Sequence, residues 1–409
     1  MAGEWRERPL VELTDNFDGI RVPVKEADRR PGAYPYYGAS GVVDHVDKYL
    51  FEGEYLLIAE DGENLRTRNT PVAFLARGKF WVNNHAHIVR GNSEADTGFL
   101  MYALSAADIS GYLTGSTMPK LTQGNMNRIP LLVPPLDEQR AIAHILGTLD
   151  DKIELNRRMN ETLEAMARAL FKSWFVDFDP VRAKAEGRDP RLPKPLADLF
   201  PARLVDSENG EIPEGWEVGC VDDEFDLTMG QSPPGETYNE VGEGVPFYQG
   251  RADFGSRFPT RRVYCTAPTR LAKAGDTLIS VRAPVGDINM ATENCAIGRG
   301  VAAARHRSGS RSYSYQFMLG LEEVFARFEA EGTVFGSIGK KDFHAISCAR
   351  PPRAVIAEFE GMLSPLDSRI DVTGRESCSL AALRDTLLPR LISGELRVKD
   401  AERVAGRAL

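Results

Sequence analysis

The feature that most constrains the fold of this chain is an internal repeat. With an offset of 217 residues, the segment from Gly115 aligns with the segment from Gly332 for about sixty residues without a gap. The starts of the two copies correspond at an offset of 211 residues. Matching positions include Trp5 with Trp216, Leu149 with Leu366, and Ile153 with Ile370. An ungapped run in register predicts two copies of one structural unit.

Each copy ends in a segment with the apolar spacing of a long helix. Apolar residues recur at alternating intervals of four and three, which places them along one side of a helix. Pro134-Pro135 followed by Asp137 and Glu138 is typical of a helix N-terminus. Prolines end the preceding segment, and acids are favoured at the positive end of the helix dipole. We therefore predict helices over about 136–175 and 353–393.

Polar residues interrupt these helices at matching positions, Asn156 and Asn160 in the first, Thr373 and Ser377 in the second. A matched polar layer fixes the register of paired helices at some cost in stability. We therefore predict an antiparallel pair; the alternative is that each helix is an ordinary amphipathic helix packed on its own domain. The predicted pairing residues are Ile142, Leu146, Leu149, Ile153, Asn156, Asn160, Leu163, Leu170, Phe359, Leu363, Leu366, Ile370, Thr373, Ser377, Leu380 and Leu387.

The remaining segments predict a mixed fold. Tyr55–Ala59, His87–Val89 and Thr277–Val281 are typical of short buried strands bounded by turn residues. Prolines among charged residues indicate a linker between the copies. The predicted class is α+β, with two mixed α/β domains separated by the long antiparallel helices and related by a pseudo-two-fold repeat. The predicted boundaries are 1–133 for the first domain, 134–177 for its helix, 178–212 for the linker, 213–350 for the second domain, 351–395 for its helix and 396–409 for a tail.

Charge and cysteine content bear on the class of protein. The chain has 409 residues, a formal net charge of −9 and a pI near 5.4, which taken alone counts against nucleic-acid binding. Residues 245–311, however, hold eleven Lys/Arg against four acids. Five scattered cysteines, a polar N-terminus and the lack of a long apolar run predict a cytoplasmic protein without a secretory signal or membrane span.

Basic, amide and aromatic side chains are the candidates for contact with DNA. The alternatives are a solvated basic face, amides that cap turns, and tyrosines that belong to the core or its rim. The candidate DNA-binding residues are Tyr36, Tyr37, Arg66, Arg68, Asn83, Asn84, Lys120, Gln249, Arg251, Arg261, Arg262, Arg282, Lys340 and Lys341.

The sequence contains neither an adenine methyltransferase motif nor the P-loop of a nucleotide-binding site. Each Pro-Pro pair lacks the preceding Asn or Asp of an adenine methyltransferase motif, and Gly339-Lys340 lacks the first glycine and the final hydroxyl residue of a P-loop. His85 and His87 would share one face of a strand, but a third metal ligand is not in view, so a turn or a polar surface is the favoured interpretation. We predict no catalytic residue and no metal site.

The segment Pro134-Pro-Leu-Asp-Glu-Gln-Arg-Ala-Ile142 resembles the conserved helix of type I restriction-modification specificity subunits. Phe175-Val-Asp-Phe-Asp-Pro-Val-Arg182 and Ile212-Pro-Glu-Gly-Trp216 are also similar to that family, so the resemblance covers essentially the whole chain. The second repeat departs from the pattern, because Pro351-Pro-Arg-Ala-Val-Ile356 lacks the Leu-x-Glu-Gln element. A partner contact expected of Glu138 and Gln139 would therefore be weaker at the second site.

The resemblance implies a function in sequence-specific DNA recognition. Each domain would be a target recognition domain that reads one half of a split, asymmetric site in double-stranded DNA. The helices, paired as a coiled coil, would dock two methyltransferase subunits, and restriction subunits with motor activity would join the complex. S-adenosylmethionine, ATP and Mg would belong to those partners, and this chain would hold no cofactor and catalyse nothing. The alternatives are a modification enzyme fused to a recognition domain, and a coiled-coil scaffold or regulatory DNA-binding protein without a restriction-modification role.

Overall fold

The computed structural model describes residues 5–208, 210–331 and 336–406. The chain forms two compact units, which we call the first unit (1–157 with 374–409) and the second unit (158–373). The unit boundaries pass through the long helices α4 (Leu136–Phe175) and α11 (Arg353–Ile392), so each helix contributes to both units. No helix in the described part of the chain combines the length and the apolar character that crossing a membrane requires.

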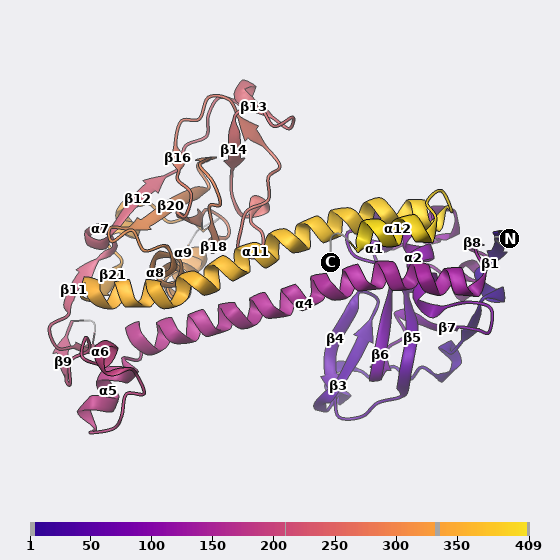
Figure 1. Cartoon of the computed structure of the whole chain (residues 1–409), viewed down its shortest axis with the longest axis horizontal. Coiled ribbons are helices and arrows are strands. Elements are labelled where there is room, and N and C mark those ends of the chain that lie inside the picture. Colours follow the sequence, from indigo (N-terminus) through magenta and orange to yellow (C-terminus); the bar gives the residue numbers. More distant parts are fainter. Residues whose placement is uncertain (1–4, 209, 332–335, 407–409) are drawn as a thin grey trace. The chain divides into compact units, whose positions relative to one another are not determined.

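A six-stranded sheet in the order β2-β7-β5-β6-β3-β4 forms the centre of the first unit (Figure 1). Leu56, Leu57 and Ile58 of β5 are all buried, because one face of the sheet is covered by α2 and the other packs an aromatic cluster around Phe80. The Asp96 carboxylate caps α2 by accepting a hydrogen bond from the Phe99 amide at 2.9 Å. The elements are β1 (Arg6–Pro9), β2 (Thr14–Asn16), β3 (Pro31–Gly38), β4 (Gly41–Val46), β5 (Phe51–Ala59), α1 (Asn64–Thr67), β6 (Ala73–Val82), β7 (Ala86–Gly91), α2 (Thr97–Ala106), α3 (Gln123–Met126) and β8 (Pro130–Val133).

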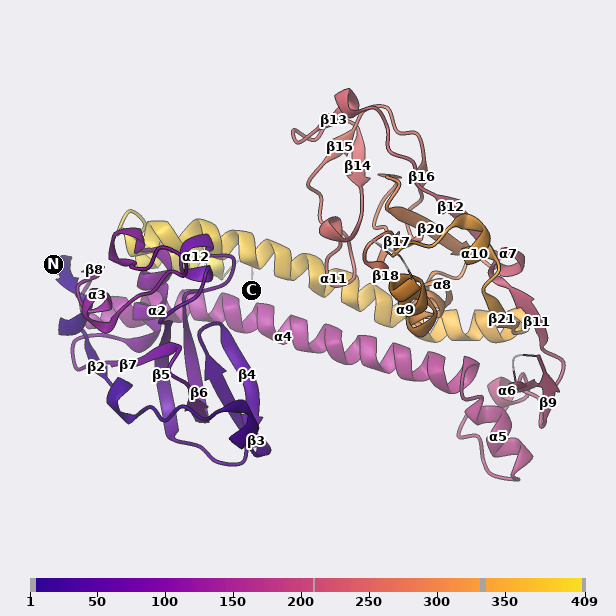
Figure 2. The ribbon, with the colours of Figure 1, turned by 180° about the vertical axis from the view of Figure 1, so that it is seen from behind.

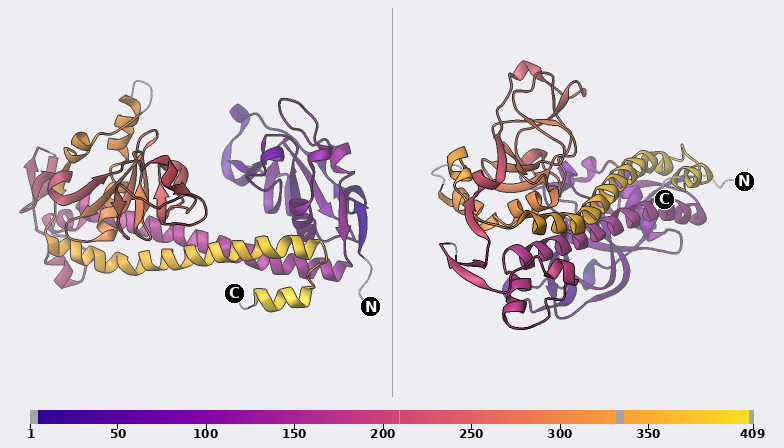
Figure 3. Two further views of the ribbon diagram at one scale, coloured as in Figure 1. Left: turned by 90° about the horizontal axis from the view of Figure 1, so that it is seen from above. Right: turned by 60° about the vertical axis from the view of Figure 1, so that its left-hand side comes forward.

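The predicted C-terminal tail instead contains a packed helix. Residues Val398–Ala405 form α12, which follows a turn at the end of α11 (Figure 3). Ala401 and Ala405 are buried in the same core as Leu387 of α11 and Leu146 of α4. Small side chains at a spacing of four residues allow the helix to approach this core closely. The prediction of a tail over 396–409 was therefore wrong for the described residues.

The second unit contains a four-stranded sheet, β12-β20-β17-β18, and a five-stranded sheet, β13-β15-β14-β19-β16 (Figure 2). Helix α8 packs on β17, β18 and β20, and α9 packs on β18. The elements are α5 (Asp179–Ala185), α6 (Lys194–Ala197), β9 (Leu204–Ser207), β10 (Gly210–Pro213), β11 (Glu217–Cys220), α7 (Val221–Glu224), β12 (Phe225–Met229), β13 (Tyr238–Asn239), β14 (Val245–Tyr248), β15 (Tyr264–Cys265), β16 (Leu271–Ala272), β17 (Thr277–Val281), β18 (Val285–Met290), β19 (Cys295–Ile297), β20 (Val301–His306), α8 (Arg311–Leu319), α9 (Glu322–Glu331), α10 (Lys340–His344) and β21 (Ser347–Arg350).

The segment 178–212 is folded as part of the second unit, which corrects the prediction of a linker. It contains α5, α6 and the hairpin of β9 and β10. Val181, Phe200 and Ile212 are buried in the main core of the second unit. Phe200 packs edge-on against Trp174 of α4, with ring centroids 5.1 Å apart. The apolar side chains between the prolines thus hold this segment against the end of the helix.

The two units repeat the same strand pairings. Strand β1 pairs antiparallel with β8, and β11 pairs in the same way with β21. The parallel pairing between β3 and β6 has its counterpart in the parallel pairing between β14 and β19. Helix α11 begins and ends 217 residues after α4. These matches confirm the predicted α+β class and the internal repeat.

Helices α4 and α11 run antiparallel in each unit. In the first unit, Asp150 bonds to Arg384 at 2.7 Å, while Asn156 bonds to Glu376 at 2.8 Å, so residue numbers rise along one helix as they fall along the other. In the second unit, the Thr373 hydroxyl donates to Asn160 Oδ1 at 2.5 Å. Each of the sixteen predicted pairing residues is buried or half-buried. The antiparallel pair that the sequence predicted is therefore confirmed.

Candidate nucleic-acid interface

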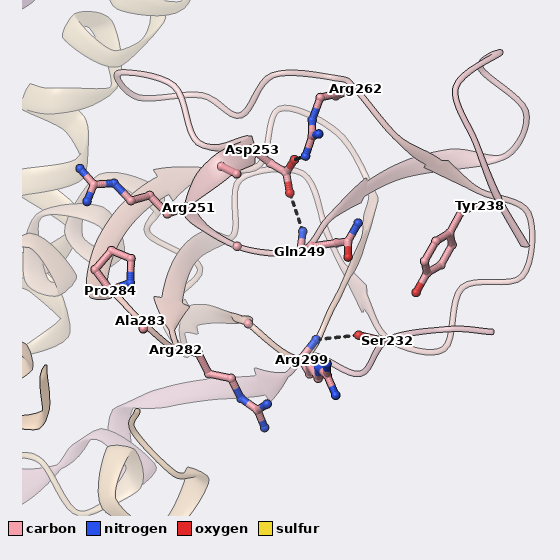
Figure 4. A pocket seen from close by; sticks show the side chains of 13 residues that line it. Ser232, Tyr238, Gln249, Arg251, Asp253, Arg262, Arg282, Ala283, Pro284 and Arg299 are labelled. Atoms are coloured by element: carbon pink, nitrogen blue, oxygen red, sulfur yellow. Dashed lines mark hydrogen bonds and ion pairs between the residues drawn. The ribbon is translucent and has the colours of Figure 1, made fainter. Parts of the chain in front are cut away.

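In the second unit, polar side chains follow the ends of two strands in each sheet, β12 and β17 in the four-stranded sheet and β14 and β19 in the five-stranded sheet. Ser232 follows β12, Gln249 follows β14, Arg282 follows β17 and Arg299 follows β19. With Tyr238 these side chains surround an open cleft of about 1080 Å³ (Figure 4). The full lining consists of Ser232, Tyr238, Gln249, Gly250, Arg251, Ala252, Asp253, Arg262, Arg282, Ala283, Pro284, Arg299 and Gly300. The structure thus brings together four of the predicted residues, namely Gln249, Arg251, Arg262 and Arg282.

Backbone hydrogen bonds between the strand ends hold the cleft in shape. The Gly298 amide donates to the Tyr248 carbonyl at 2.8 Å, and the Val281 amide donates to the Gly300 carbonyl at 2.9 Å. A Cβ atom on Gly300 would lie only 2.3 Å from the Gln249 carbonyl oxygen, so the turn requires glycine for this close approach. The side chains that follow these strands therefore project from a fixed backbone.

Four arginines give the cleft a strongly positive lining. Arg262 pairs with Asp253 at 2.8 Å, and this hydrogen bond raises the pKa of the Arg262 guanidinium. Arg251 pairs with Asp287 at 3.3 Å. Arg282 and Arg299 are exposed, and neither forms an ion pair with any residue that the structure describes. Exposed guanidinium groups on a fixed backbone suit an anionic or base-edge partner such as DNA.

Other predicted residues of the second unit lie outside the cleft lining. Arg261 is exposed and pairs with Glu293 at 2.6 Å, and Lys340 and Lys341 are exposed at the start of α10. Conversely, Arg299 lines the cleft but was not among the candidates. The sequence shows Arg299 only as one of the basic residues of 245–311. Its position next to β14 depends on a long-range parallel pairing that no local pattern reports.

The equivalent surface of the first unit has a different set of side chains. Lys120 pairs with Glu60 at 3.3 Å, and His85 Nδ1 lies 2.8 Å from an Asp61 carboxylate oxygen. Asn84 is exposed beside them. Asn83 is buried, and its Oδ1 atom accepts a hydrogen bond from the His85 amide at 2.8 Å. The alternative given for the amides, a turn cap, therefore applies to Asn83, whereas Asn84 remains accessible.

Arg66 and Arg68 are held by contacts within the first unit. Arg66 is half-exposed and pairs with Glu63 at 3.3 Å. Arg68 donates to the carbonyl oxygens of Ser105 and Ala107 at 3.2 and 2.7 Å, at the C-terminal end of α2. A cation at this end satisfies carbonyls that have no partner within the helix. Arg68 therefore stabilises the end of α2, and this role accounts for its position without a ligand.

The two candidate tyrosines pack within the sheet of the first unit. Tyr36 is 1% exposed, its hydroxyl accepts a hydrogen bond from the Val24 amide at 3.0 Å, and Arg29 covers its ring. Tyr37 is half-buried against Phe80, and burial raises the pKa of its hydroxyl. The assignment of Tyr36 to DNA contact is corrected by its burial, because the side chain has no exposed surface. The alternative of a core aromatic fits both residues.

His85 and His87 point to separate partners. His87 is buried between Asp18, at 2.6 Å from Nδ1, and the Leu121 carbonyl, at 2.8 Å from Nε2. His85 instead contacts Asp61 at the surface. Within the described ranges, no group of three or more His, Cys, Asp or Glu residues is arranged to hold a metal ion. The two imidazoles thus stabilise the first unit through separate contacts, His87 with Asp18 and Leu121, and His85 with Asp61.

Gln139 at the start of α4 is buried, which corrects the expectation that it contacts a partner protein. Its Nε2 atom donates to the carbonyls of Glu94 and Pro134 at 3.0 and 2.9 Å, and its Oε1 atom accepts from the Asp96 amide at 2.9 Å. Since the side chain is 1% exposed, it joins α4 to the turn before α2. Glu138 is half-buried and lies 3.9 Å from Arg397.

Comparisons with known proteins agree with this architecture. Residues 3–165 match the type I restriction modification DNA specificity domain. The putative type I restriction enzyme MjaX specificity subunit of Methanocaldococcus jannaschii is 32% identical over 68% of this chain. The chain spans 62% of that relative's length. The type I restriction enzyme MjaIX specificity subunit of the same organism is 23% identical over 97% of this chain and 94% of its own length.

A solved structure supports the fold over nearly the whole chain. The crystal structure of the S subunit of a type I restriction-modification system from M. genitalium matches with a TM-score of 0.65. The match covers 95% of this chain and 96% of that chain at 17% sequence identity. At this identity the match concerns the fold, and it agrees with the mixed units and long helices described above.

Proposed function

Because the chain belongs to the family of type I restriction-modification DNA specificity subunits, we propose that it selects the DNA sequence on which partner subunits act. Each unit reads one half of a bipartite, asymmetric site in double-stranded DNA. The chain itself contributes recognition and no catalytic step. Methyl transfer with S-adenosylmethionine, and ATP- and Mg-dependent cleavage, belong to separate methyltransferase and restriction subunits. The proposed compartment is the cytoplasm, which suits its five unpaired cysteines.

The observation that carries this proposal is the repeated arrangement of strand ends. A protein that reads two different half-sites needs two recognition surfaces on related frameworks, and this chain provides the same strand pairings twice. In the second unit the repeated strand ends surround a cleft with four arginines. Basic and amide side chains on a rigid support are the groups that read base edges and track phosphates.

The proposed docking sites for two methyltransferase subunits are the helices α4 and α11. Each helix is 40 residues long, about 60 Å at 1.5 Å per residue. Residues that face the other helix or the core of a unit are buried, and the exposed residues along the rest of each helix are accessible to other subunits. Both helices take part in both units. A subunit that binds either helix is therefore attached to an element that also packs against a recognition domain.

The test is to co-express the chain with a type I methyltransferase subunit and to map methylated bases across the host genome. We expect one bipartite motif to be methylated only when both chains are present. The methyltransferase subunit alone is the control. Methylation that does not depend on this chain would contradict the proposal. Binding of the purified complex to DNA that weakens steeply with salt would separate it from a scaffold without a DNA role.

A second experiment tests the independence of the halves. Replacing residues 1–133 with the corresponding segment of a family member should change one half of the methylated motif and leave the other half intact. A change in both halves would contradict the assignment of one half-site to each unit.

A further inference from the structure

The cleft of the second unit and the equivalent surface of the first unit share a backbone framework at the level of single hydrogen bonds. Three amide-to-carbonyl bonds between strand ends occur in both units at matching positions, all between 2.8 and 3.1 Å. In the first unit the amides of Asn83, Glu60 and Leu121 donate to the carbonyls of Tyr37, His85 and Glu60, respectively. In the second unit the amides of Gly298, Val281 and Ile338 donate to the carbonyls of Tyr248, Gly300 and Val281, in the same order. The strand ends therefore correspond residue by residue in their backbone hydrogen bonds.

This framework sets up a correspondence between single side chains at the strand ends of the two units. An isolated bridge joins Asp61 to Lys120 in the first unit, and the same bridge joins Arg282 to Ser337 in the second. Arg282 therefore occupies the position of Asp61. One residue beyond the matched amides of Asn83 and Gly298, Arg299 occupies the position of Asn84.

Charge is not retained at these corresponding positions. An acid replaces Arg282 and an amide replaces Arg299 in the first unit, although the backbone hydrogen bonds are the same. The phosphate backbone of DNA is chemically identical at every base pair, so a phosphate contact would call for a cation in both units. Base edges differ between half-sites, so contacts with bases require different side chains. The pattern of a fixed backbone with exchanged side chains thus points to base contact.

We propose that Arg282 and Arg299, together with their counterparts Asp61 and Asn84, are specificity-determining residues of the two half-sites. This inference rests on the proposed function. Arg282 and Arg299 have no carboxylate partner in the described chain, so they bind without first breaking an ion pair. Arginine donates two parallel hydrogen bonds to guanine O6 and N7 in the major groove, so the second half-site contains guanine. Asn84 selects adenine in the first half-site by the equivalent bidentate contact.

The experiment exchanges one corresponding pair, Arg299 and Asn84, between the units in the complex with the methyltransferase subunit. Arg299→Asn transfers the side chain of the first unit to the second, and Asn84→Arg performs the reverse change. Arg270→Asn is the matched control, because Arg270 is an exposed arginine that lies outside the cleft lining and is not among the candidate DNA-binding residues. Specificity is measured by methylation mapping and by selection of bound sequences from a randomised DNA pool. Thermal unfolding of each variant confirms that the fold is retained.

We expect Arg299→Asn to relax or change the preference for guanine in the second half-motif only. Loss of one bidentate contact should lower discrimination at that position by roughly 5- to 150-fold. Asn84→Arg should alter the first half-motif only, and Arg270→Asn should alter neither. A wild-type second half-motif without guanine would overturn the inference. So would uniformly weaker binding by Arg299→Asn with unchanged base preference, which identifies a phosphate contact.

The two proposals fail in different ways. If the wild-type complex methylates no bipartite motif, the proposed function fails. If it methylates one and the exchanged residues leave both half-motifs unchanged, only the specificity assignment fails.

Discussion

Arg257 is a buried cation that ties the recognition part of the second unit to both long helices. Its side chain is 4% exposed, and its guanidinium lies 2.5 Å from Glu164 of α4 and 2.5 Å from Asp367 of α11. The ring of Tyr315 lies 4.3 Å from the guanidinium carbon. We predict that Arg257→Met strongly destabilises the second unit, because it leaves two carboxylates near each other without a cation.

The magnitude follows from the burial of the partners. The Asp367 side chain is 11% exposed and that of Glu164 is 25% exposed. Removing one member of a buried ion pair costs about 3–5 kcal/mol. At an m-value of about 2–3 kcal/mol per molar urea, the unfolding midpoint should fall by roughly 1–2.5 M.

The first unit offers a matched control. Asp150, the counterpart of Asp367 in the repeat, pairs with Arg384 at 2.7 Å, but these side chains are 32% and 30% exposed. A pair that water reaches contributes about 0–1 kcal/mol, so Arg384→Met should have a small effect. Hydrogen exchange measured across a urea series reports on each unit separately, with the amides of β17 and β18 as the probe for the second.

A further variant tests the physical cause. Adding Glu164→Gln and Asp367→Asn to Arg257→Met removes the uncompensated charges and should recover most of the lost stability. Equal destabilisation by Arg257→Met and Arg384→Met would refute this explanation, and so would a neutral triple variant that is no more stable than Arg257→Met.

Three further predictions concern buried polar side chains, each measured by urea unfolding. Burial lowers the pKa of His306 even though Glu224 opposes the shift, so the folded state keeps it neutral. Because the unfolded chain takes up the proton below about pH 6.5, stability should fall as the pH drops through that value, and His306→Gln should flatten this slope. Asn156→Leu should change the stability of the first unit by less than about 1 kcal/mol, because relief of the buried, unsatisfied Oδ1 offsets loss of the hydrogen bond from Nδ2 to Glu376; a larger loss would contradict this. Gln139→Ala should cost about 3 kcal/mol, at roughly 1 kcal/mol for each of its three hydrogen bonds, and a loss below 1 kcal/mol would argue against their importance.

Long helices and strands followed from local patterns in the sequence. The Pro-Pro pair before α4 and the acids in its first turn predicted where this helix begins. Helix α11 has no acid in its first turn, so its start was predicted from the internal repeat. The strand predicted at Thr277–Val281 coincides with β17. These features depend on residues within a few turns of one another, which is why the sequence alone was sufficient.

The candidate site followed less well, because it depends on pairing between distant strands. Arg282 and Arg299 line the same cleft because they follow β17 and β19, which belong to different sheets. Local sequence patterns do not predict the order of strands in a sheet. The tyrosine side chain of Tyr36 is of a type that often binds ligands, but its position along β3 directs it into the core. Similarly, prolines indicated a linker around Phe200, whereas its aromatic ring packs against Trp174. Composition describes what a side chain can do, and tertiary packing decides whether it is available.

The division of α4 and α11 between the units has a consequence for synthesis on the ribosome. The second unit is one continuous stretch, 158–373, whereas the first is completed only by residues 374–409. Chains emerge from the N-terminus, so the second unit can fold while the first still lacks Leu380, Leu387 and Leu391 of its core. A premature stop shortly after Thr373 would therefore damage the unit that was made first and leave intact the unit nearest the break.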